Sequence, residues 1–192
     1  KITDWPKIVL ESANKLKIKK FSIIGVSGGA PFALACANKI KSKILKSVAI
    51  VCPLAPHNAK GMRNGRVGML LNYGKKPITS WLLINFLRIR LLNSDTEKSF
   101  ARWKNKIPLP KSDSKLFTID RGIKLMENFK EAIKHGTTGV HRDANLYSKD
   151  WGFKLKNIER KIFVWHGEKD LTVPIITNKY YKKKLKNKEI FI

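Results

Sequence analysis

Acidic residues, cysteines and long apolar runs are all scarce in this sequence, and each shortage excludes a class of protein. Two cysteines, Cys36 and Cys52, are too few for a disulfide framework, so we expect both to be small buried hydrophobic side chains. A reducing compartment, here the cytoplasm, is therefore expected. The most apolar run, residues 81–87, is followed by Arg88 and Arg90 and is too short to span a membrane.

The shortage of acidic residues leaves a formal net charge of +26, from 40 lysine and arginine residues against 14 aspartate and glutamate residues. A basic surface of this size is typical of proteins that bind nucleic acid or an anionic membrane. Sites that read nucleic acid favour arginine, however, because guanidinium groups form paired hydrogen bonds to bases and phosphates. Here the excess is mostly lysine and is spread along the chain, for example at Lys15, Lys17, Lys19, Lys20, Lys39, Lys41, Lys43, Lys46, Lys182, Lys183, Lys184 and Lys186. We therefore interpret the lysines as solvated faces and expect no nucleic-acid partner; binding of nucleic acid or of a membrane surface is the lesser alternative.

A chain of 192 residues is long enough for one hydrophobic core and too short for two full-sized domains. Helical and strand patterns alternate near both ends of the chain. They predict helices at 5–16, 31–40 and 174–185, and strands at 21–26, 47–51, 161–166 and from 189 onward. Such alternation predicts an α/β fold, with a mostly parallel sheet and helices on both faces.

Between the second and third predicted strands lie more than a hundred residues with almost no strand pattern. Helical patterns fall near 78–92, 95–105, 113–134 and 138–149. A connection of this length is not a simple crossover loop. We therefore predict two core segments, 1–53 and 159–192, and a helical lid insertion, 54–158, which would leave the sheet at its carboxyl edge and overhang a site there.

The first predicted strand ends in Gly25-Val26-Ser27-Gly28-Gly29 and passes at once into an apolar helix. A Gly-x-Ser-x-Gly turn between a strand and a helix holds a serine hydroxyl out for nucleophilic attack, beside the free N–H groups of the new helix. The chain is crowded around the strained serine, so only hydrogen is expected to fit as the side chain at Gly25 and Gly29. The alternatives are a glycine-rich turn without chemistry and a dinucleotide-binding turn. The latter needs Gly-x-Gly-x-x-Gly and an acidic residue after the next strand, whereas that strand ends in Cys52-Pro53.

A second pattern follows the third predicted strand, where the chain reads His166-Gly167-Glu168-Lys169-Asp170-Leu171-Thr172-Val173-Pro174. Because parallel strands end at one edge of a sheet, Asp170 is expected at the same edge as Ser27. A catalytic triad needs a fixed carboxylate in such a place to orient its histidine. Alternatively, Asp170 is a turn residue or caps the helix that begins near Pro174.

Together these two patterns resemble the α/β-hydrolase superfamily, and within it small hydrolases with a helical lid. Leu54-Ala55-Pro56 and Asp150-Trp151-Gly152-Phe153 also match, so the resemblance extends over nearly the whole chain. It implies that Ser27 is the nucleophile, Asp170 the triad acid and the backbone N–H of Gly28 one oxyanion donor. It also implies a serine hydrolase that acts through an acyl-enzyme on a small-molecule ester, thioester or related acyl substrate, and that needs no metal or organic cofactor.

The resemblance further implies a triad histidine one helix and one strand after the acid, whereas all four histidines precede Asp170. His57, His135 and His141 are poor candidates for the base, and His166 is expected to support the acid loop. We therefore expect an internal fragment of a longer hydrolase, inactive by itself, without the first strands, the second oxyanion donor and the catalytic histidine. A non-catalytic ligand-binding protein of the same fold is the main alternative, and no oligomeric state is predicted.

Overall fold

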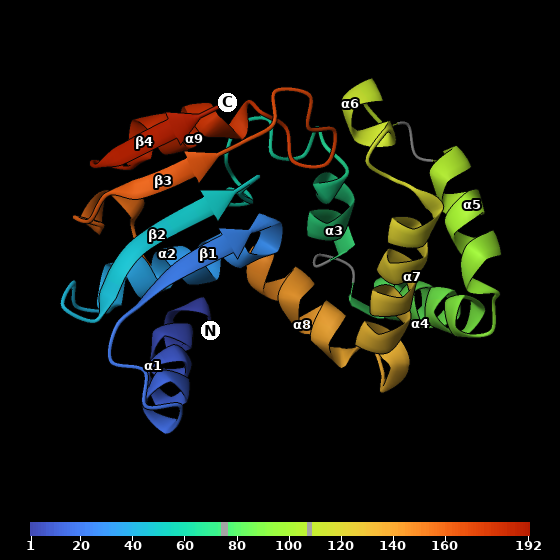
Figure 1. The fold of residues 1–192 in the computed structure, drawn as a ribbon, viewed down its shortest axis with the longest axis horizontal. Helices are drawn as coiled ribbons and strands as arrows, with labels where there is room; N and C mark the ends of the chain where they lie inside the picture. The colour runs from blue at the N-terminus through green and yellow to red at the C-terminus, as the bar shows by residue number, and fades with distance from the viewer. Residues whose placement is uncertain (74–76, 107–108) are drawn as a thin grey trace. The chain divides into compact units, whose positions relative to one another are not determined.

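Four parallel strands, which neighbour one another in chain order, form the sheet of the described chain. The computed structural model describes residues 1–73, 77–106 and 109–192. The strands are β1 (Phe21–Val26), β2 (Leu45–Val51), β3 (Ile162–Trp165) and β4 (Lys188–Phe191) (Figure 1). The predicted α/β class with a parallel sheet is confirmed.

The described chain divides into two compact units. The first comprises residues 1–72 and 145–192 and contains the whole sheet. The second comprises residues 73–144 and falls within the insertion predicted at 54–158. The role of this insertion as a lid stays a prediction.

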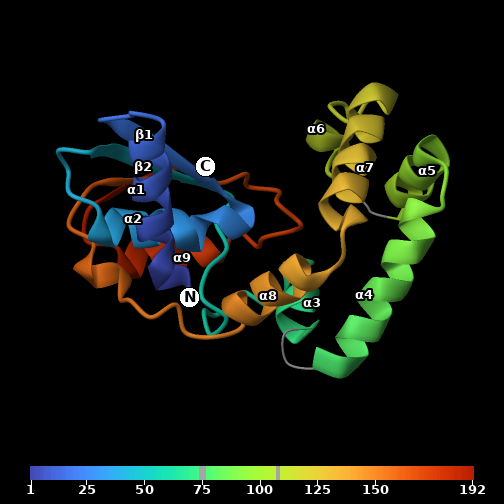
Figure 2. The same cartoon turned by 90° about the horizontal axis from the view of Figure 1, so that it is seen from below.

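The helices of the first unit alternate with its strands. Two helices precede β1: η1 (Ile2–Asp4) and α1 (Trp5–Lys15). The connection from β1 to β2 contains η2 (Ser27–Gly29) and α2 (Ala30–Lys39). On either side of β3 lie η3 (Leu155–Asn157) and α9 (Thr177–Lys184), and the boundary of the unit falls at α3 (Val67–Tyr73). α2 begins with Pro31 in its first turn, where the missing N–H costs no helical hydrogen bond. Most side chains of α2 are buried, and α1 packs against it (Figure 2).

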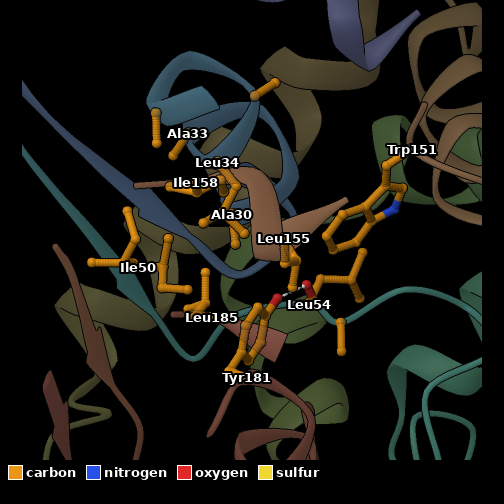
Figure 3. Close-up of a cluster of buried hydrophobic side chains, with 14 of the residues drawn as sticks. Ala30, Ala33, Leu34, Ile50, Leu54, Trp151, Leu155, Ile158, Tyr181 and Leu185 are labelled. Carbon is orange, nitrogen blue, oxygen red and sulfur yellow. Dashed lines mark hydrogen bonds between the residues drawn. The ribbon is translucent and has the colours of Figure 1, made fainter. Parts of the chain in front are cut away.

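One face of the sheet carries the core of the first unit (Figure 3). Leu34 of α2, Val48 and Ile50 of β2, and Tyr181 of α9 are all fully buried in this core. The hydroxyl of Tyr181 donates to the carbonyl oxygen of Leu54 at 2.5 Å, so its burial leaves no unpaired polar group. Each buried apolar side chain of this size contributes roughly 1.5–3 kcal/mol, which holds α2 and α9 on this face.

The opposite face of the sheet is apolar and exposed. Side chains alternate across a strand, and on this face Ile24, Val26 and Trp165 are 70%, 59% and 48% exposed. Trp165 stacks on Phe191 with ring centroids 4.0 Å apart. The sequence predicts helices on both faces. Among the described residues, helices cover one face, while the other keeps the apolar side chains that a covered sheet requires.

Arg160 joins the C-terminal end of α2 to the start of β2. Its guanidinium donates to the carbonyl oxygens of Ala37 at 3.0 Å and Leu45 at 2.5 Å, and also to that of Ile40. The last carbonyl groups of a helix have no partner within the helix. Arg160 therefore supplies from outside the hydrogen bonds that α2 cannot make at its end.

The second unit is helical. α4 (Pro77–Leu92) and α5 (Thr96–Lys106) each contact α7 (Ile119–Lys134), α6 (Lys111–Ser114) is a single turn, and α8 (Thr138–Tyr147) leads back to the first unit. Arg88 donates to the carbonyl oxygens of Ile133 at 2.6 Å and Lys134 at 2.5 Å, which ties α4 to the end of α7. No described helix combines the length and apolar character needed to cross a membrane.

Candidate active site

Ser27 lies at the junction of β1 and α2, one residue beyond the strand. Val26 is extended, with φ −96° and ψ 134°, whereas Ser27 has φ 50° and the helical turns begin with it. A positive φ is uncommon for a residue that carries a Cβ and marks a strained turn. This is the strand–turn–helix geometry that a Gly-x-Ser-x-Gly pattern predicts.

The crowding around this turn falls on Gly25 and Gly28. A Cβ at Gly25 would lie 2.7 Å from the Cβ of Ala33 and 2.8 Å from the carbonyl oxygen of Gly29. A Cβ at Gly28 would lie 2.6 Å from the hydroxyl oxygen of Tyr147, a neighbour that sequence reasoning missed. Nothing lies within 4 Å of a Cβ built at Gly29. The expectation that only hydrogen fits as the side chain is therefore confirmed at Gly25 and wrong at Gly29. The reason is that α2 packs against the strand side of the turn and leaves the space around Gly29 open.

The register of the sheet brings together the residues that follow its strands. Ser27 follows β1, Cys52 follows β2 and His166 follows β3, and these strands are adjacent. The N–H of Leu54 donates to the carbonyl oxygen of Ser27 at 3.1 Å, and the N–H of Cys52 donates to that of Trp165 at 2.7 Å. The chain that leaves β2 is thus bonded both to the serine turn and to the end of β3.

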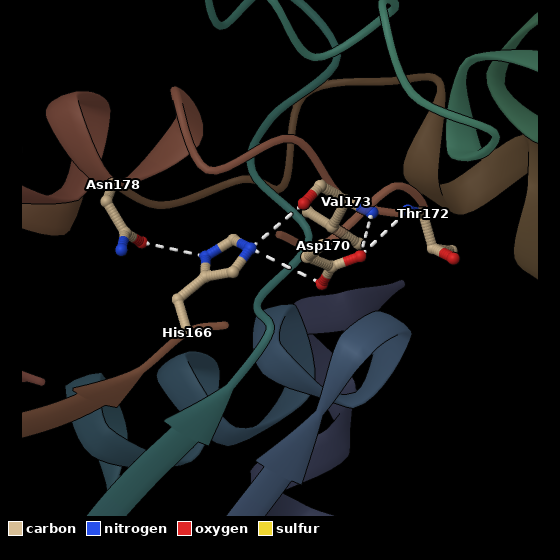
Figure 4. Close-up of polar contacts among 5 residues, drawn as sticks. All are labelled: His166, Asp170, Thr172, Val173 and Asn178. Carbon is tan, nitrogen blue, oxygen red and sulfur yellow. Dashed lines mark hydrogen bonds and ion pairs between the residues drawn. The ribbon is translucent and has the colours of Figure 1, made fainter. Parts of the chain in front are cut away.

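Asp170 lies in the loop after β3 and accepts hydrogen bonds from four donors. Three of them, in His166, Thr172 and Val173, are drawn in Figure 4, and the fourth is the thiol of Cys52, which follows β2. Oδ1 of Asp170 accepts the N–H groups of Thr172 at 2.7 Å and Val173 at 3.0 Å, and its Oδ2 lies 3.4 Å from Nε2 of His166. Burial by itself would raise the pKa of this carboxyl. Hydrogen bonds from His166, the two N–H groups and the thiol of Cys52 outweigh burial and lower the pKa below its usual value. Asp170 is therefore an ionised carboxylate whose position is fixed by hydrogen bonds. It does not cap α9, because that helix begins only at Thr177.

His166 stabilises the loop that carries Asp170 through hydrogen bonds, as expected. Its side chain is fully buried. Nδ1 lies 3.0 Å from Oδ1 of Asn178, and Nε2 lies 2.9 Å from the carbonyl oxygen of Val173. Burial lowers the pKa of the imidazole, but the hydrogen bonds to Asp170, Val173 and Asn178 outweigh that effect and raise the pKa overall. Nε2 is engaged within the loop and Nδ1 is engaged by Asn178 of α9, so His166 is not placed to take a proton from Ser27.

The two cysteines differ. Cys36 is buried in α2, as expected, and burial raises the pKa of its thiol to about 11. Cys52 is only half-buried, has φ 44° and donates to Asp170. Its expected role as a buried hydrophobic side chain is wrong, because its strand ends at the polar edge of the sheet. The one signal in the sequence was its position directly after the strand that neighbours β1.

Cys52, His166 and Asp170 are also the one described cluster with ligand atoms close enough for a metal ion, all within 4.8 Å of one another. A metal would need the lone pair of Nε2 of His166. That nitrogen lies 2.9 Å from the carbonyl oxygen of Val173, which can only accept, so Nε2 carries a hydrogen. The three side chains fit a hydrogen-bonded network better than a metal site.

The other three histidines are not bonded to Ser27. Nδ1 of His57 and Nε2 of His141 are buried without a hydrogen-bond partner among the described residues, and His135 is exposed at the end of α7. A general base must lie within hydrogen-bond reach of the serine, directly or through a water. The expectation that the triad histidine lies outside this sequence therefore stays a prediction.

The two other segments that resemble α/β hydrolases, residues 54–56 and 150–153, both lie in the first unit. Leu54 and Ala55 are fully buried, and Trp151 is almost fully buried with its ring centroid 6.2 Å from that of Phe153. Asp150 accepts the N–H of Gly152 at 2.7 Å, which closes a tight turn. A cavity of about 360 Å³ is formed mainly by residues 56–58 and 150–156. Neither the serine turn nor Asp170 lines it.

The sheet, its order and the serine turn define the class: the chain has the fold of the α/β-hydrolase superfamily. Similar solved structures include an esterase from Exiguobacterium antarcticum, with 13% identity, a TM-score of 0.61 and coverage of 100% of this chain and 65% of that one. A hydrolase from Oleispira antarctica has 16% identity and a TM-score of 0.60, with coverage of 99% and 62%. The esterase RhEst1 from a Rhodococcus species has 13% identity and a TM-score of 0.59, with coverage of 97% and 62%.

This chain thus spans about three fifths of the length of the structures that it resembles. No protein-family model matches the sequence, and no curated protein matches it. At these identities the likeness establishes the fold alone.

Proposed function

We propose that this chain is the part of a serine hydrolase that carries the nucleophile and the triad acid. The observation that supports this most is the backbone of Ser27, which has φ 50° between a parallel strand and a helix at the carboxyl edge of the sheet. The fixed carboxylate of Asp170, in the loop after β3, supports it as well. Two structures of similar fold are esterases, which favours an ester or thioester as the substrate.

In the proposed reaction the hydroxyl of Ser27 attacks the acyl carbon, and a histidine outside the printed sequence takes its proton. Asp170 orients that histidine and stabilises its charged form. The N–H of Gly28, in the turn that leads into α2, binds the oxyanion. The tetrahedral intermediate then collapses, the ester or thioester bond breaks, and the alcohol or thiol leaves with the proton from the histidine. Water, activated by the same histidine, hydrolyses the acyl-serine and releases the acid. The insertion at 54–158 selects the substrate. No step uses a metal or an organic cofactor.

A fluorophosphonate probe, applied to the longer gene product, tests the proposal. We expect labelling that disappears in Ser27→Ala and falls by orders of magnitude in Asp170→Asn, since a triad histidine without its carboxylate adopts the wrong tautomer. Ser22→Ala is the matched control, because Ser22 is a serine of β1, the strand that leads to Ser27, and its hydroxyl accepts a hydrogen bond from Ser47 at 2.8 Å. Failure of the folded protein to react with the probe would overturn the proposal.

The 192-residue chain by itself is expected to hydrolyse p-nitrophenyl acetate no faster than its Ser27→Ala variant does. A serine without a general base is a weak nucleophile, and no described histidine is bonded to Ser27. Turnover that Ser27→Ala abolishes would place a base inside this chain. A binding protein of the same fold, the second candidate, would instead give no labelling at any length and keep its ligand affinity in Ser27→Ala.

A further inference from the structure

Helix α4 exposes an apolar side. Its large apolar side chains at Ile78, Trp81, Leu82, Leu83, Phe86, Leu87 and Ile89 are 40–76% exposed. At about 100° per residue, these seven positions spread over more than half of the helix circumference. The polar positions in the same arc are Thr79, Asn85 and Arg90. The narrower packed side holds Ser80, Ile84, Arg88 and Leu91, and Arg88 is bonded to the end of α7.

An ordinary surface helix turns its apolar stripe inward and its charges outward. By contrast, α4 is apolar around most of its circumference and leaves most of its large apolar side chains exposed. Single exposed apolar side chains need no explanation, but a contiguous group on one helix marks an interaction site. Trp81 and Phe86 are the largest members of the group. Aromatic side chains of this kind are enriched where a protein meets a partner or a membrane interface.

A groove of about 400 Å³ lies beside this side of α4, within the second unit. It is lined by Leu87, Arg90, Leu91 and Ser94 at the end of α4 and by Ser99, Arg102, Trp103 and Lys106 of α5. Its lining includes three cationic side chains and no acidic one. An apolar groove with a cationic rim is complementary to an acyl chain that carries an anionic head group.

We propose that α4 and this groove form a docking surface for an anionic lipid bilayer. The exposed apolar side of α4 enters the head-group and acyl boundary, where burial of its large apolar side chains drives the insertion. Arg90, Arg102 and Lys106 bind lipid phosphates through charge-assisted hydrogen bonds. The helix lies on the membrane and does not cross it, in agreement with its length. This surface belongs to the second unit alone and does not depend on the chemistry of Ser27.

Charge selects a bilayer over a second copy of this chain as the occupant. The chain has a net charge of +26, and residues 73–144 contain fifteen lysine and arginine residues against seven aspartate and glutamate residues. Two such surfaces repel each other, whereas an anionic membrane attracts lysine and arginine side chains within a Debye length. The lysine excess that the sequence spreads over every segment would then act as a general attraction, and α4 as the specific contact.

Co-sedimentation of the 192-residue protein with vesicles tests the proposal. Vesicles of phosphatidylcholine are compared with vesicles of equal parts phosphatidylcholine and phosphatidylglycerol, at about 0.15 M salt. We expect binding to the anionic vesicles only. Trp81→Ser combined with Phe86→Ser is expected to weaken binding about tenfold or more, since buried apolar area drives insertion. Arg102→Gln is expected to weaken it about fivefold.

Matched variants separate vesicle binding by this surface from binding through positive charge or exposed apolar side chains elsewhere in the chain. Lys182→Gln with Lys183→Gln removes two charges from α9, and Leu16→Ser with Ile18→Ser removes two exposed apolar side chains from the first unit. Both control pairs are expected to change binding less than about twofold, because they lie off the docking surface. Leu82→Asp is a second α4 variant, and circular dichroism checks that each variant folds.

Three results would overturn the proposal. One is failure to bind anionic vesicles. Another is equal loss of binding in the control and α4 variants, which would assign the attraction to the lysines as a whole. The third is self-association by sedimentation velocity that the Trp81 and Phe86 substitutions abolish without any vesicle binding, which would make a second copy the occupant.

Discussion

Tyr147 and Gly28 are more than a hundred residues apart in the sequence, yet the tyrosine hydroxyl fills the space that a side chain at Gly28 would need. Tyr147 also packs edge-to-face on Phe32 of α2, with ring centroids 6.2 Å apart. The serine turn is thus held from the strand side, at Gly25, and from the end of α8. Its third glycine, Gly29, has neither constraint.

Three alanine substitutions separate these roles. Gly25→Ala and Gly28→Ala are each expected to lower the free energy of unfolding by about 1–3 kcal/mol, because the new methyl group meets packed atoms. Gly29→Ala is expected to change it by less than about 0.5 kcal/mol, because Gly29 has an ordinary helical φ of −73° and open space around it. Urea denaturation measures all three. A cost at Gly29 equal to that at Gly28 would contradict this account of the turn.

The ion pair of His166 and Asp170 makes stability depend on pH. The pKa of His166 is raised by folding. Its contribution to the stability of the fold is therefore complete below the pKa of the unfolded state, about 6.5, and is lost as the pH rises through the pKa of the folded state. The pKa of Asp170 is lowered, so its contribution is present above its unfolded value of about 3.9 and is lost as the pH falls through the folded value. The pair therefore stabilises the fold most between about pH 4 and 6.5.

Asp170→Asn tests this coupling. The difference in unfolding free energy between the natural chain and the variant is expected to shrink as the pH rises above about 6.5 and through the raised folded pKa of His166, because His166 then loses its charge. The difference should not vanish, since the N–H groups of Thr172 and Val173 also lose a charged acceptor. Asp4→Asn, at an exposed carboxyl, is the control. A difference that does not vary with pH would show that His166 is neutral in the folded state.

Among the elements, those with a regular apolar pattern were predictable. The strand at 21–26 is observed as β1, and the helical patterns at 78–92, 95–105 and 138–149 correspond to α4, α5 and α8. The pattern at 113–134 is divided into α6 and α7, because Thr118 caps a new helix by accepting the N–H of Arg121 at 3.5 Å. Periodicity does not reveal such a break, since the apolar positions continue across it.

The candidate site can be proposed from the sequence only where its residues form a motif of consecutive residues, and its catalytic role stays a prediction. Ser27 and Asp170 stand in motifs, so the sequence identifies them. Tyr147 and Cys52 reach the site through the packing of α8 and the order of the strands, and no local pattern records those contacts. The exposed side of α4 was missed for the same reason. An apolar helix is expected to be buried until its neighbours are known.

Arg160 provides a test at the level of elements, because it serves α2 and β2 together. Arg160→Met is expected to lower the free energy of unfolding by about 2–4 kcal/mol, since it leaves three carbonyl groups without their charge-assisted donors. Arg160→Lys should lower the free energy of unfolding by an intermediate amount, because an ammonium group keeps the charge but lacks the planar set of donors of a guanidinium. Lys161→Met is the control. It breaks an exposed ion pair with Glu189 at 2.5 Å and is expected to cost less than about 1 kcal/mol. Equal losses in the two methionine variants would contradict this role.

At the scale of the whole first unit, the sheet is apolar on both faces and covered by described helices on one. Ile24→Thr, on the open face, is expected to change the free energy of unfolding of this chain by less than about 0.5 kcal/mol. Val48→Thr, on the fully buried face, is expected to cost about 1–3 kcal/mol, because its hydroxyl loses water without gaining a partner. Thermal or urea unfolding measures both.

The same pair of substitutions, made in the longer gene product, shows whether further chain covers the open face. If it does, Ile24→Thr there becomes as costly as Val48→Thr. If Ile24→Thr stays neutral at both lengths, the open face is a surface of the whole protein, and the expectation of a second helical layer fails.

The order of the strands gives the lysines near them a further meaning. β1 and β4 are the outer strands of the described sheet, and each presents an unpaired row of backbone groups along which another sheet could be added. Lys19 and Lys20 stand just before β1, Lys186 stands just before β4, and Lys188 is the first residue of β4. Charges at these places repel an approaching strand that carries the same residues. For the 192-residue chain by itself, part of the excess positive charge would thus act as a guard against edge-to-edge aggregation of the described sheet.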